Sequence, residues 1–221
     1  MIRSTVIAVC MLSGFLLSGC GIYQSHGFGC LADLPPGKVE TLPVTMPANA
    51  PSISQRFRLE GASSRSEHKG IDILVPIDTP VLAAADGTVS RVQTSVLYGR
   101  QVMIDHAATA DGQRLQTRYF HLAERRVVVG DRVRRGEVIG LSGLSGMAGA
   151  FPHLHFEVHR LTGDPDAIAA GVLNPQFYWL DGPGRITCYD RRRDMPETPV
   201  TLTYPVPCRD LPWRVDPDEP Q

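Results

Sequence analysis

One short segment of this 221-residue chain alternates polar and apolar side chains without exception: HLHFEVH, residues 153–159. Successive side chains of a β-strand point to opposite faces, so this period of two predicts a strand that places Leu154, Phe156 and Val158 in a core. Its other face then carries three histidines and Glu157. Imidazoles at neighbouring positions on one face are costly as packing and useful as chemistry. The segment therefore predicts a half-buried strand with a functional polar face.

Short β-type runs separated by glycine and Asp-Gly extend over the region from about Ser52 to Leu180. Asp-Gly at 86–87 and at 111–112 each lies between two such runs, which predicts consecutive hairpins. No apolar period of 3.6 residues persists in this region, although residues 164–173 are expected to form one short helix. The pattern predicts a mostly β domain, built on an antiparallel sheet with few short helices.

The beginning of the chain predicts export and a lipid anchor. Residues 1–19 contain one positive residue, an apolar stretch and then small residues, which is typical of a secretory signal shorter than a membrane span. Residues 17–20, LSGC, resemble the bacterial lipobox, in which the cysteine becomes the first residue and is acylated; the alternative is an ordinary signal with an incidental cysteine. Lipidation is therefore expected at Cys20. Gly21 resembles the signal for outer-membrane delivery, so the expected location is the cell envelope, facing the periplasm.

The rest of the chain divides into three parts by composition. Residues 20–51 are rich in proline, glycine and small residues and are expected to form a flexible tether. Residues 52–180 hold the β-type runs and form the domain. Residues 181–221 are expected to be a Pro- and Arg-rich extension that is partly ordered and pinned by a disulfide.

Three cysteines remain after the signal and the lipidated residue: Cys30, Cys188 and Cys208. In an oxidising compartment, a disulfide between Cys188 and Cys208 is the first expectation, and pairing of Cys30 with one of them is the alternative. A zinc site made of these cysteines is disfavoured, because no two of them have the short spacing of metal-binding loops.

The charge balance excludes nucleic acid as a partner. The formal net charge is −1, and the short arginine runs are separated by acidic or apolar residues. Nucleic-acid binding relies on a basic field that this chain lacks.

Further histidines lie in two other segments. His68 and Asp72 are four residues apart across a glycine that permits a tight bend, so both can converge on one ion, and His121 lies at the end of another run. A catalytic zinc site needs three nitrogen or oxygen ligands and an open fourth position. His68, Asp72 and one histidine of the 153/155 pair satisfy that count. The remaining histidines are then free to hydrogen-bond a water, an oxyanion or a leaving amine.

These motifs resemble those of the M23 family of metallopeptidases, the lysostaphin and LytM type. The matching segments are HxGxD at 68–72, TPVxAAADGxV at 79–89, YGxxVxIDH at 98–106, YxHL at 119–122, VxxGDxVxxGxxIGxxG at 127–143 and PHLHFEV at 152–158. The resemblance implies a groove floored by an antiparallel sheet and hydrolysis of the peptide stems that cross-link peptidoglycan. It implies Zn²⁺ bound by His68, Asp72 and His155, with His121 and His153 acting on the water and the transition state.

The sequence departs from this family pattern in one place. Phe151 stands where the pattern has glycine, and the stretch 146–151 is one residue longer. This departure concerns one groove wall and hence substrate preference, rather than the metal.

Other polar residues near these motifs receive weaker roles. His106 is expected to be structural and outside the metal shell, and no role is expected for His159 or for His26 in the tether. Two interpretations of Glu157 stay open: a carboxylate that orients a ligand imidazole, or a buried carboxylate that caps backbone amides.

Two other functions compete with catalysis. An inactive LytM-type module would bind the cell wall and activate other wall hydrolases, but such proteins usually lack a ligand, whereas all five expected positions are filled here. The segments ADGTVSRV and GDRVRRGEVIG also resemble biotinyl and lipoyl carriers. Carriers need a lysine at the hairpin tip between these halves, and the only lysines are Lys38 and Lys69. The sequence favours the enzyme and leaves protein partners open.

Overall fold

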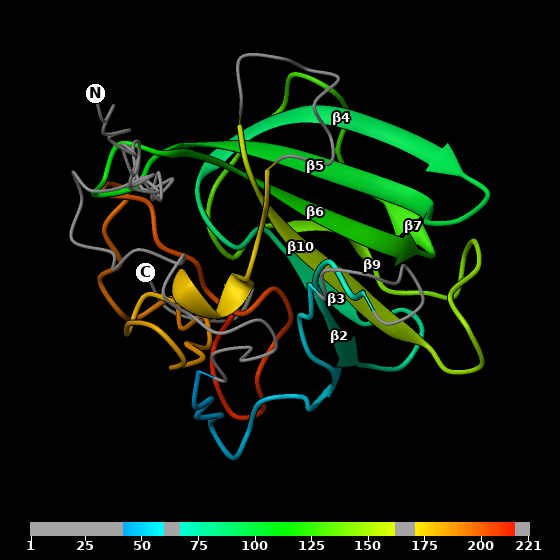
Figure 1. Ribbon diagram of the computed structural model, residues 1–221, viewed down its shortest axis with the longest axis horizontal. Coiled ribbons are helices and arrows are strands. Elements are labelled where there is room, and N and C mark those ends of the chain that lie inside the picture. Colours follow the sequence, from blue (N-terminus) through cyan, green and yellow to red (C-terminus); the bar gives the residue numbers. More distant parts are fainter. Residues whose placement is uncertain (1–41, 60–66, 162–170, 215–221) are drawn as a thin grey trace, which may run out of the picture. The chain divides into compact units, whose positions relative to one another are not determined.

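A computed structural model describes residues 42–59, 67–161 and 171–214 of the chain (Figure 1). All of these residues belong to one compact unit, Glu40–Gln221. The signal, Cys20, Cys30 and most of the tether lie outside the described residues, so the expectations for them stay predictions. Among the described residues, no helix is long and apolar enough to cross a membrane.

Nearly all the regular structure of the described residues is β. The elements are β1 (Ile53–Gln55), β2 (Ile71–Leu74), β3 (Pro80–Leu82), β4 (Gly87–Ser95), β5 (Gly99–Ala108), β6 (Arg114–Leu122), β7 (Glu124–Arg125), β8 (Arg132–Val133), β9 (Val138–Leu141), β10 (His153–Arg160), β11 (Val172–Leu173) and the short 3-10 helix η2 (Pro175–Phe177).

Two sheets organise these strands. The main sheet has the order β1-β2-β10-β6-β5-β4-β8, with β11 paired to β10, and the smaller sheet has the order β3-β9-β7. Every pair is antiparallel. In Figure 1 the long strands β4, β5, β6 and β10 lie side by side. The predicted class, a mostly β antiparallel fold, is confirmed.

The two expected Asp-Gly turns have different outcomes. The turn at 111–112 closes the β5–β6 hairpin, and Gly112 has a left-handed φ of 80° there. The prediction of a hairpin at 86–87 is wrong, because this turn leads from β3 in the small sheet to β4 in the main sheet. Contacts distant in sequence hold it: Asp86 Oδ1 accepts the Arg135 N–H at 2.6 Å, and its carbonyl lies 2.7 Å from His106 Nδ1.

Most of the helix expected at 164–173 lies outside the described residues. The prediction is wrong for the end of this segment, because Val172–Leu173 form the strand β11. The reason lies in β10. Strand β2 pairs with residues 153–156 of β10, which leaves the same edge open farther along, and β11 pairs with Val158 and His159 there. Strand pairing thus satisfies backbone groups that would otherwise lack partners.

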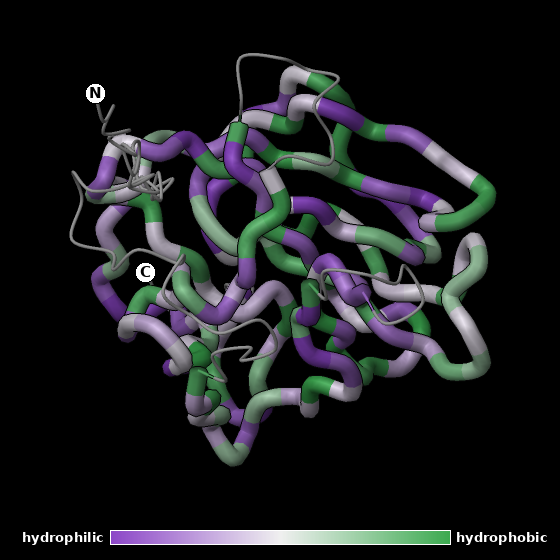
Figure 2. Tube along the Cα trace, viewed as in Figure 1, coloured by the Kyte–Doolittle hydropathy of each residue, from purple (hydrophilic) through white to green (hydrophobic). Residues whose placement is uncertain are grey.

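The core lies on one face of the main sheet. Hydrophobic and hydrophilic colours alternate along the strands in Figure 2, as the period-two pattern requires. Phe156 of β10 packs against Tyr119 of β6 and Trp179, with ring centroids 5.3 and 6.4 Å apart. Tyr119 also accepts a hydrogen bond from the backbone of Ala84, at 2.9 Å. The core thus joins the main sheet to the segment after β3.

The C-terminal segment belongs to this core. Leu202, Tyr204 and Val206 are fully buried, and Cys188 forms a disulfide with Cys208, the first of the two pairings that the sequence left open. The sequence predicted a partly ordered extension after residue 180. In the structure, residues from Ile186 to Cys208 instead share one hydrophobic cluster with the sheet strands.

Candidate metal centre

Adjacent strands bring the first three candidate ligands together. Asp72 of β2 and His155 of β10 are direct partners in the antiparallel register. His68 precedes β2 and is fixed by paired backbone hydrogen bonds with Arg58. Between them, a Cβ on Gly70 would come within 2.2 Å of the Phe156 carbonyl oxygen. Close packing of this segment on β10, rather than a tight bend, therefore requires glycine.

Three side-chain atoms of these residues converge. His68 Nε2 lies 3.1 Å from Asp72 Oδ1 and 3.2 Å from His155 Nδ1, and His155 Nδ1 lies 2.7 Å from the same carboxylate oxygen. Asp72 and His155 are buried, and His68 is partly buried. Among the described residues, His68, Asp72 and His155 are the group of histidine, cysteine or acidic side chains that could hold a metal ion.

Hydrogen bonds on the outer side of the ligands fix which ring nitrogens face the centre. His68 Nδ1–H donates to the carbonyl oxygen of Arg56 at 2.9 Å, which leaves Nε2 directed inward. His155 Nε2–H donates to Glu157 Oε1 at 3.0 Å, which leaves Nδ1 directed inward. Both imidazoles are thereby oriented before any ion binds.

The charges of this cluster are strongly coupled. Burial acts to raise the pKa of Asp72, but hydrogen bonds from His155 and His68 outweigh it and hold that pKa below its usual range. Burial acts to lower the pKa of His155, whereas hydrogen bonds to Asp72 and Glu157 raise it to about 9. The Asp72 carboxylate is therefore ionised at neutral pH, which is the form that binds a cation.

Two further histidines border the three ligands. The rings of His121 and His153 lie 5.0 Å apart between centroids, and His153 Nε2 lies 3.7 Å from Asp72 Oδ1. Their Nδ1–H groups donate to backbone carbonyls, of Ser145 and Phe151, each at 2.9 Å. Neither Nε2 atom has a hydrogen-bond partner among the described residues, so each can accept a hydrogen bond from a substrate or a water.

His121 occupies an unusual backbone conformation. Its φ of 60° is left-handed, which is uncommon for a residue other than glycine and is found preferentially at functional sites. Burial lowers the pKa of its imidazole, and the hydrogen bond to the Ser145 carbonyl opposes this only partly. His121 is therefore neutral at pH 7.

Residues 66–167, which hold all five of these side chains, match Peptidase family M23. They form an M23 peptidase domain. The predicted resemblance is confirmed, and the strands that carry the metal centre are the strands of this domain.

Several curated proteins are similar to part of this chain. Over 93 residues the chain is 45% identical to an uncharacterized metalloprotease of Haemophilus influenzae, covering 42% of this chain and 18% of that protein. It is 39% identical over 110 residues to the peptidoglycan DD-endopeptidase ShyA of Vibrio cholerae, covering 48% and 24%. It is 42% identical over 115 residues to the DD-carboxypeptidase/endopeptidase Mpg of Neisseria meningitidis, covering 52% and 25%. The chain thus spans a quarter or less of these relatives.

Solved structures are also similar to part of this chain. LytU is 30% identical, with 57% of this chain and 83% of that chain covered and a TM-score of 0.47. The catalytic domain of lysostaphin from Staphylococcus simulans is 28% identical, with 52% and 84% covered and a TM-score of 0.44.

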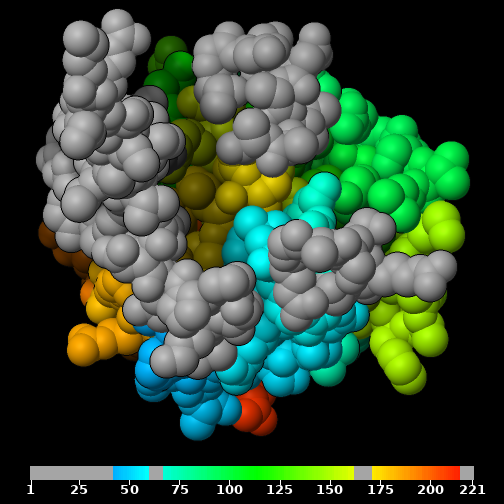
Figure 3. Space-filling view, in the orientation of Figure 1, coloured from blue at the N-terminus to red at the C-terminus, as the bar shows by residue number. Residues whose placement is uncertain are grey.

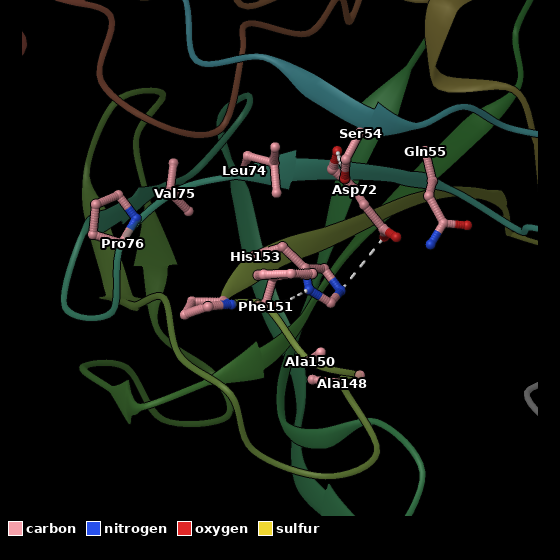
Figure 4. Close-up of a pocket in the computed structure, with 12 residues that line it drawn as sticks. Ser54, Gln55, Asp72, Leu74, Val75, Pro76, Ala148, Ala150, Phe151 and His153 are labelled. Carbon is pink, nitrogen blue, oxygen red and sulfur yellow. Dashed lines mark hydrogen bonds and ion pairs between the residues drawn. The ribbon is translucent and has the colours of Figure 1, made fainter.

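A cavity of about 660 Å³ adjoins the metal centre of the M23 domain. Its lining residues are Ser54, Gln55, Asp72, Leu74, Val75, Pro76, Ala148, Gly149, Ala150, Phe151, Pro152 and His153. Figure 4 shows β1 and β2 on one side and the loop with Phe151 on the other, with His153 directed at Asp72. In Figure 3 the atoms of β10 are set back beside the cyan atoms around β2. Phe151, which replaces the glycine of the M23 pattern, is 73% exposed at this wall.

The other histidines of the M23 domain have separate environments. His106 is buried, with Nδ1–H donating to the Asp86 carbonyl and Nε2 2.7 Å from Thr117 Oγ1, away from the metal ligands as expected. His159, for which no role was expected, lies with its Nε2 2.6 Å from Glu157 Oε2. The period-two pattern already placed His159 and Glu157 on the face of His155. It could have indicated this contact.

Proposed function

We propose that the M23 domain is a zinc endopeptidase that hydrolyses the peptide cross-links of bacterial peptidoglycan. The observation that carries this proposal is the convergence of three metal-binding atoms with two histidines whose Nε2 atoms are available. The name of the relative ShyA, a peptidoglycan DD-endopeptidase, supports peptidoglycan as the substrate, and the name of Mpg, a DD-carboxypeptidase/endopeptidase, supports peptidase activity.

The three donors suit zinc. Two imidazoles and one carboxylate are the nitrogen and oxygen ligands of catalytic zinc sites, which bind the metal at about 2.0–2.2 Å. Donors arranged tetrahedrally at those lengths lie about 3.3 Å apart. The observed separations of 2.7, 3.1 and 3.2 Å require only small adjustments. A zinc ion bound there would supply a Lewis acid for a peptide carbonyl and lower the pKa of a water toward 7.

His121 and His153 are suited to move protons. Because each Nδ1–H is engaged by a backbone carbonyl, the neutral imidazole has its lone pair on Nε2, where it can accept a proton from an attacking water. The imidazolium formed in this way can then donate that proton to the leaving amine. Two such groups at a ring separation of 5.0 Å allow one to act as base while the other stabilises the oxyanion or protonates the amine.

Digestion of purified peptidoglycan sacculi tests this function. The full chain should release soluble muropeptides, release should stop with a chelator, and added zinc should restore it. Mass spectrometry of the products would identify the bond that is cut. Binding to sacculi without any release, under all metal conditions, would contradict the proposal and favour a wall-binding module that activates other hydrolases.

We also propose that the chain is a lipoprotein held at the outer membrane, facing the periplasm. The lipobox-like LSGC at 17–20 and Gly21 support this location. Labelling of cells with a fatty-acid analogue should mark the wild type and not Cys20→Ala. Labelling of both proteins would contradict acylation at Cys20.

A further inference from the structure

The outer hydrogen bonds of the four site histidines are not alike. For three of them the acceptor is a backbone carbonyl: Arg56 for His68, Ser145 for His121 and Phe151 for His153. For His155 alone among these four, the acceptor is a carboxylate, that of Glu157. A carboxylate carries a full negative charge, so it affects its imidazole more strongly than a neutral carbonyl does.

Glu157 is fixed in place by two histidines. It is 3% exposed, and each carboxylate oxygen has its own partner: Oε1 accepts from His155 at 3.0 Å and Oε2 accepts from His159 at 2.6 Å. His159 is itself 3% exposed. Burying a carboxylate is costly unless it is paired and hydrogen-bonded. The His155–Glu157–His159 arrangement satisfies both oxygens and prevents the carboxylate from turning away.

The strand explains why these three side chains meet. Residues 155, 157 and 159 alternate along β10 and so lie on one face, while Leu154, Phe156 and Val158 are fully buried on the other. Both neighbouring edges of β10 are paired over this stretch, with β6 on one side and β2 and β11 on the other. The backbone under the arrangement is therefore hydrogen-bonded on both sides, and the contact of His159 with this group is its 2.6 Å contact with Glu157.

We propose that Glu157, held by His159, is a positioning residue for the metal centre. It accepts the hydrogen bond from the Nε2–H of His155, so that Nδ1 is the ring nitrogen presented to the ion, and it places a second negative charge beside the cation in addition to Asp72. This inference rests on the proposed zinc-dependent function, because it concerns the same ion. In this role Glu157 and His159 position a ligand, His155, and do not bind the ion themselves.

A purely structural role for Glu157 makes a different prediction. If the carboxylate only stabilised the fold, its loss would lower the stability of the metal-free protein and leave zinc affinity unchanged. Zinc affinity and metal-free stability must therefore be measured separately. Zinc affinity of the full chain can be measured by competition with a chelator, and metal-free stability by thermal unfolding.

Four variants define the test. Glu157→Gln keeps an acceptor for His155 but removes the charge, Glu157→Ala removes both, and His159→Leu removes the donor that holds Glu157. Glu124→Gln is the matched control, because this carboxylate is 52% exposed and pairs with Arg126 on the surface. We expect zinc affinity to fall about 10-fold in Glu157→Gln and about 100-fold in Glu157→Ala. His159→Leu should lose severalfold, and the control should stay within about twofold of the wild type.

A spectroscopic measurement shows whether the ligand geometry changes. Cobalt(II) bound in place of zinc should give a visible absorption band that shifts in Glu157→Gln and is unchanged in Glu124→Gln. Zinc affinity within twofold of the wild type in both Glu157→Gln and His159→Leu would overturn the inference, and these two variants decide it even if Glu157→Ala does not fold. A wild type that binds no zinc would overturn the proposed function as well, so the two failures are distinguishable.

Discussion

His121 combines two features that packing alone does not explain. Its backbone is left-handed, and among the described residues its Nε2 has no hydrogen-bond partner while Nδ1 is held by the Ser145 carbonyl. Strained backbone at a non-glycine residue persists only where the surroundings enforce it. Here the strained backbone places an imidazole beside the candidate ligands, with its ring centroid 6.1 Å from that of His155.

The His121→Ala variant should therefore separate metal binding from turnover. Zinc affinity should stay near that of the wild type, because Nε2 of His121 is not one of the converging atoms. The rate of peptide release should fall about 10²-fold or more, as is typical for loss of a positioned acid or base. His155→Ala is the comparison and should lose both zinc and turnover. Full activity of either variant would contradict the assignment.

His106 gives the fold a sensitivity to acid. Burial lowers the pKa of His106 to about 4, and the hydrogen bond to the Asp86 carbonyl opposes this only partly. The unfolded chain, with the ordinary pKa of about 6.5, binds a proton more readily than the folded chain does. Stability is therefore unaffected by this group above about pH 6.5 and is lost as pH falls toward about 4, by up to about 3 kcal/mol.

The matching variant is His106→Gln. Its free energy of unfolding, measured in urea, should decrease less between pH 7 and pH 4 than that of the wild type. Carboxylates that titrate in the same range contribute to both proteins and cancel in the difference. Equal slopes for the two proteins would show that His106 is not buried in its neutral form.

At the scale of elements, the contact between β2 and β10 assembles the candidate metal centre. The segment that carries His68 and Asp72 approaches β10 so closely that a Cβ at Gly70 would collide with the Phe156 carbonyl. Backbone cannot move aside as a flexible side chain can. One glycine thus allows the candidate ligands of the two strands to converge.

Gly70→Ala should weaken zinc binding and lower stability together, because β2 must shift away from β10. Gly112→Ala is the control. Apart from its two chain neighbours, no atom of the described residues lies within 4 Å of a Cβ there. The left-handed φ is what opposes the change, at a cost of about 1 kcal/mol. The control should bind zinc normally. Wild-type zinc affinity in Gly70→Ala would indicate that the close approach does not matter for the centre.

Phe151 contributes differently, through the loop that forms one wall of the cavity. Its backbone carbonyl accepts a hydrogen bond from His153, and any side-chain variant keeps this carbonyl. Its ring is largely exposed at the wall of the cavity. Phe151→Ala should raise KM up to about 10-fold, the equivalent of about 1.4 kcal/mol of apolar contact with the substrate. Zinc affinity and kcat should change little. A fall in kcat at constant KM would show that the ring acts on His153 instead.

Local pattern in the sequence predicted strands well and tertiary turns poorly. Strict alternation at 153–159 is enough to define β10, because period two directly states which residues face the core. At 86–87 the same Asp-Gly signal joins two different sheets, and at Val172 the open edge of β10 overrides a helical composition. Contacts with residues distant in sequence determine the structure at both places, and a local sequence pattern holds no information on such contacts.

The candidate site shows the same limit. Strand parity places Glu157 and His159 on the face of His155, but which oxygen meets which imidazole depends on side-chain rotamers set by neighbouring strands. The family motifs predicted the candidate ligands and the fold together, because the segments that carry those ligands are also the segments that form β2, β6 and β10.

At the scale of the whole molecule, the C-terminal segment is part of the folded unit. Its buried residues share the core with β10 and β6, and a disulfide closes a loop with a sequence separation of 20 around them. Composition suggested an appendage, because proline and arginine are frequent there. The apolar residues between the prolines, Leu202 and Tyr204 among them, were few enough to escape a pattern search and are fully buried nonetheless.

Reduction of the Cys188–Cys208 disulfide should therefore destabilise the entire domain. A cross-link over a loop of this length removes chain entropy from the unfolded state that corresponds to about 3 kcal/mol. Urea unfolding of the wild type should shift to lower denaturant when a reductant is added. The Cys188→Ala/Cys208→Ala double variant should unfold at that lower midpoint with or without reductant. If the double variant still responded to reductant, Cys30 would form a disulfide with a cysteine other than Cys188 and Cys208, and the stabilisation could not be assigned to the C-terminal loop.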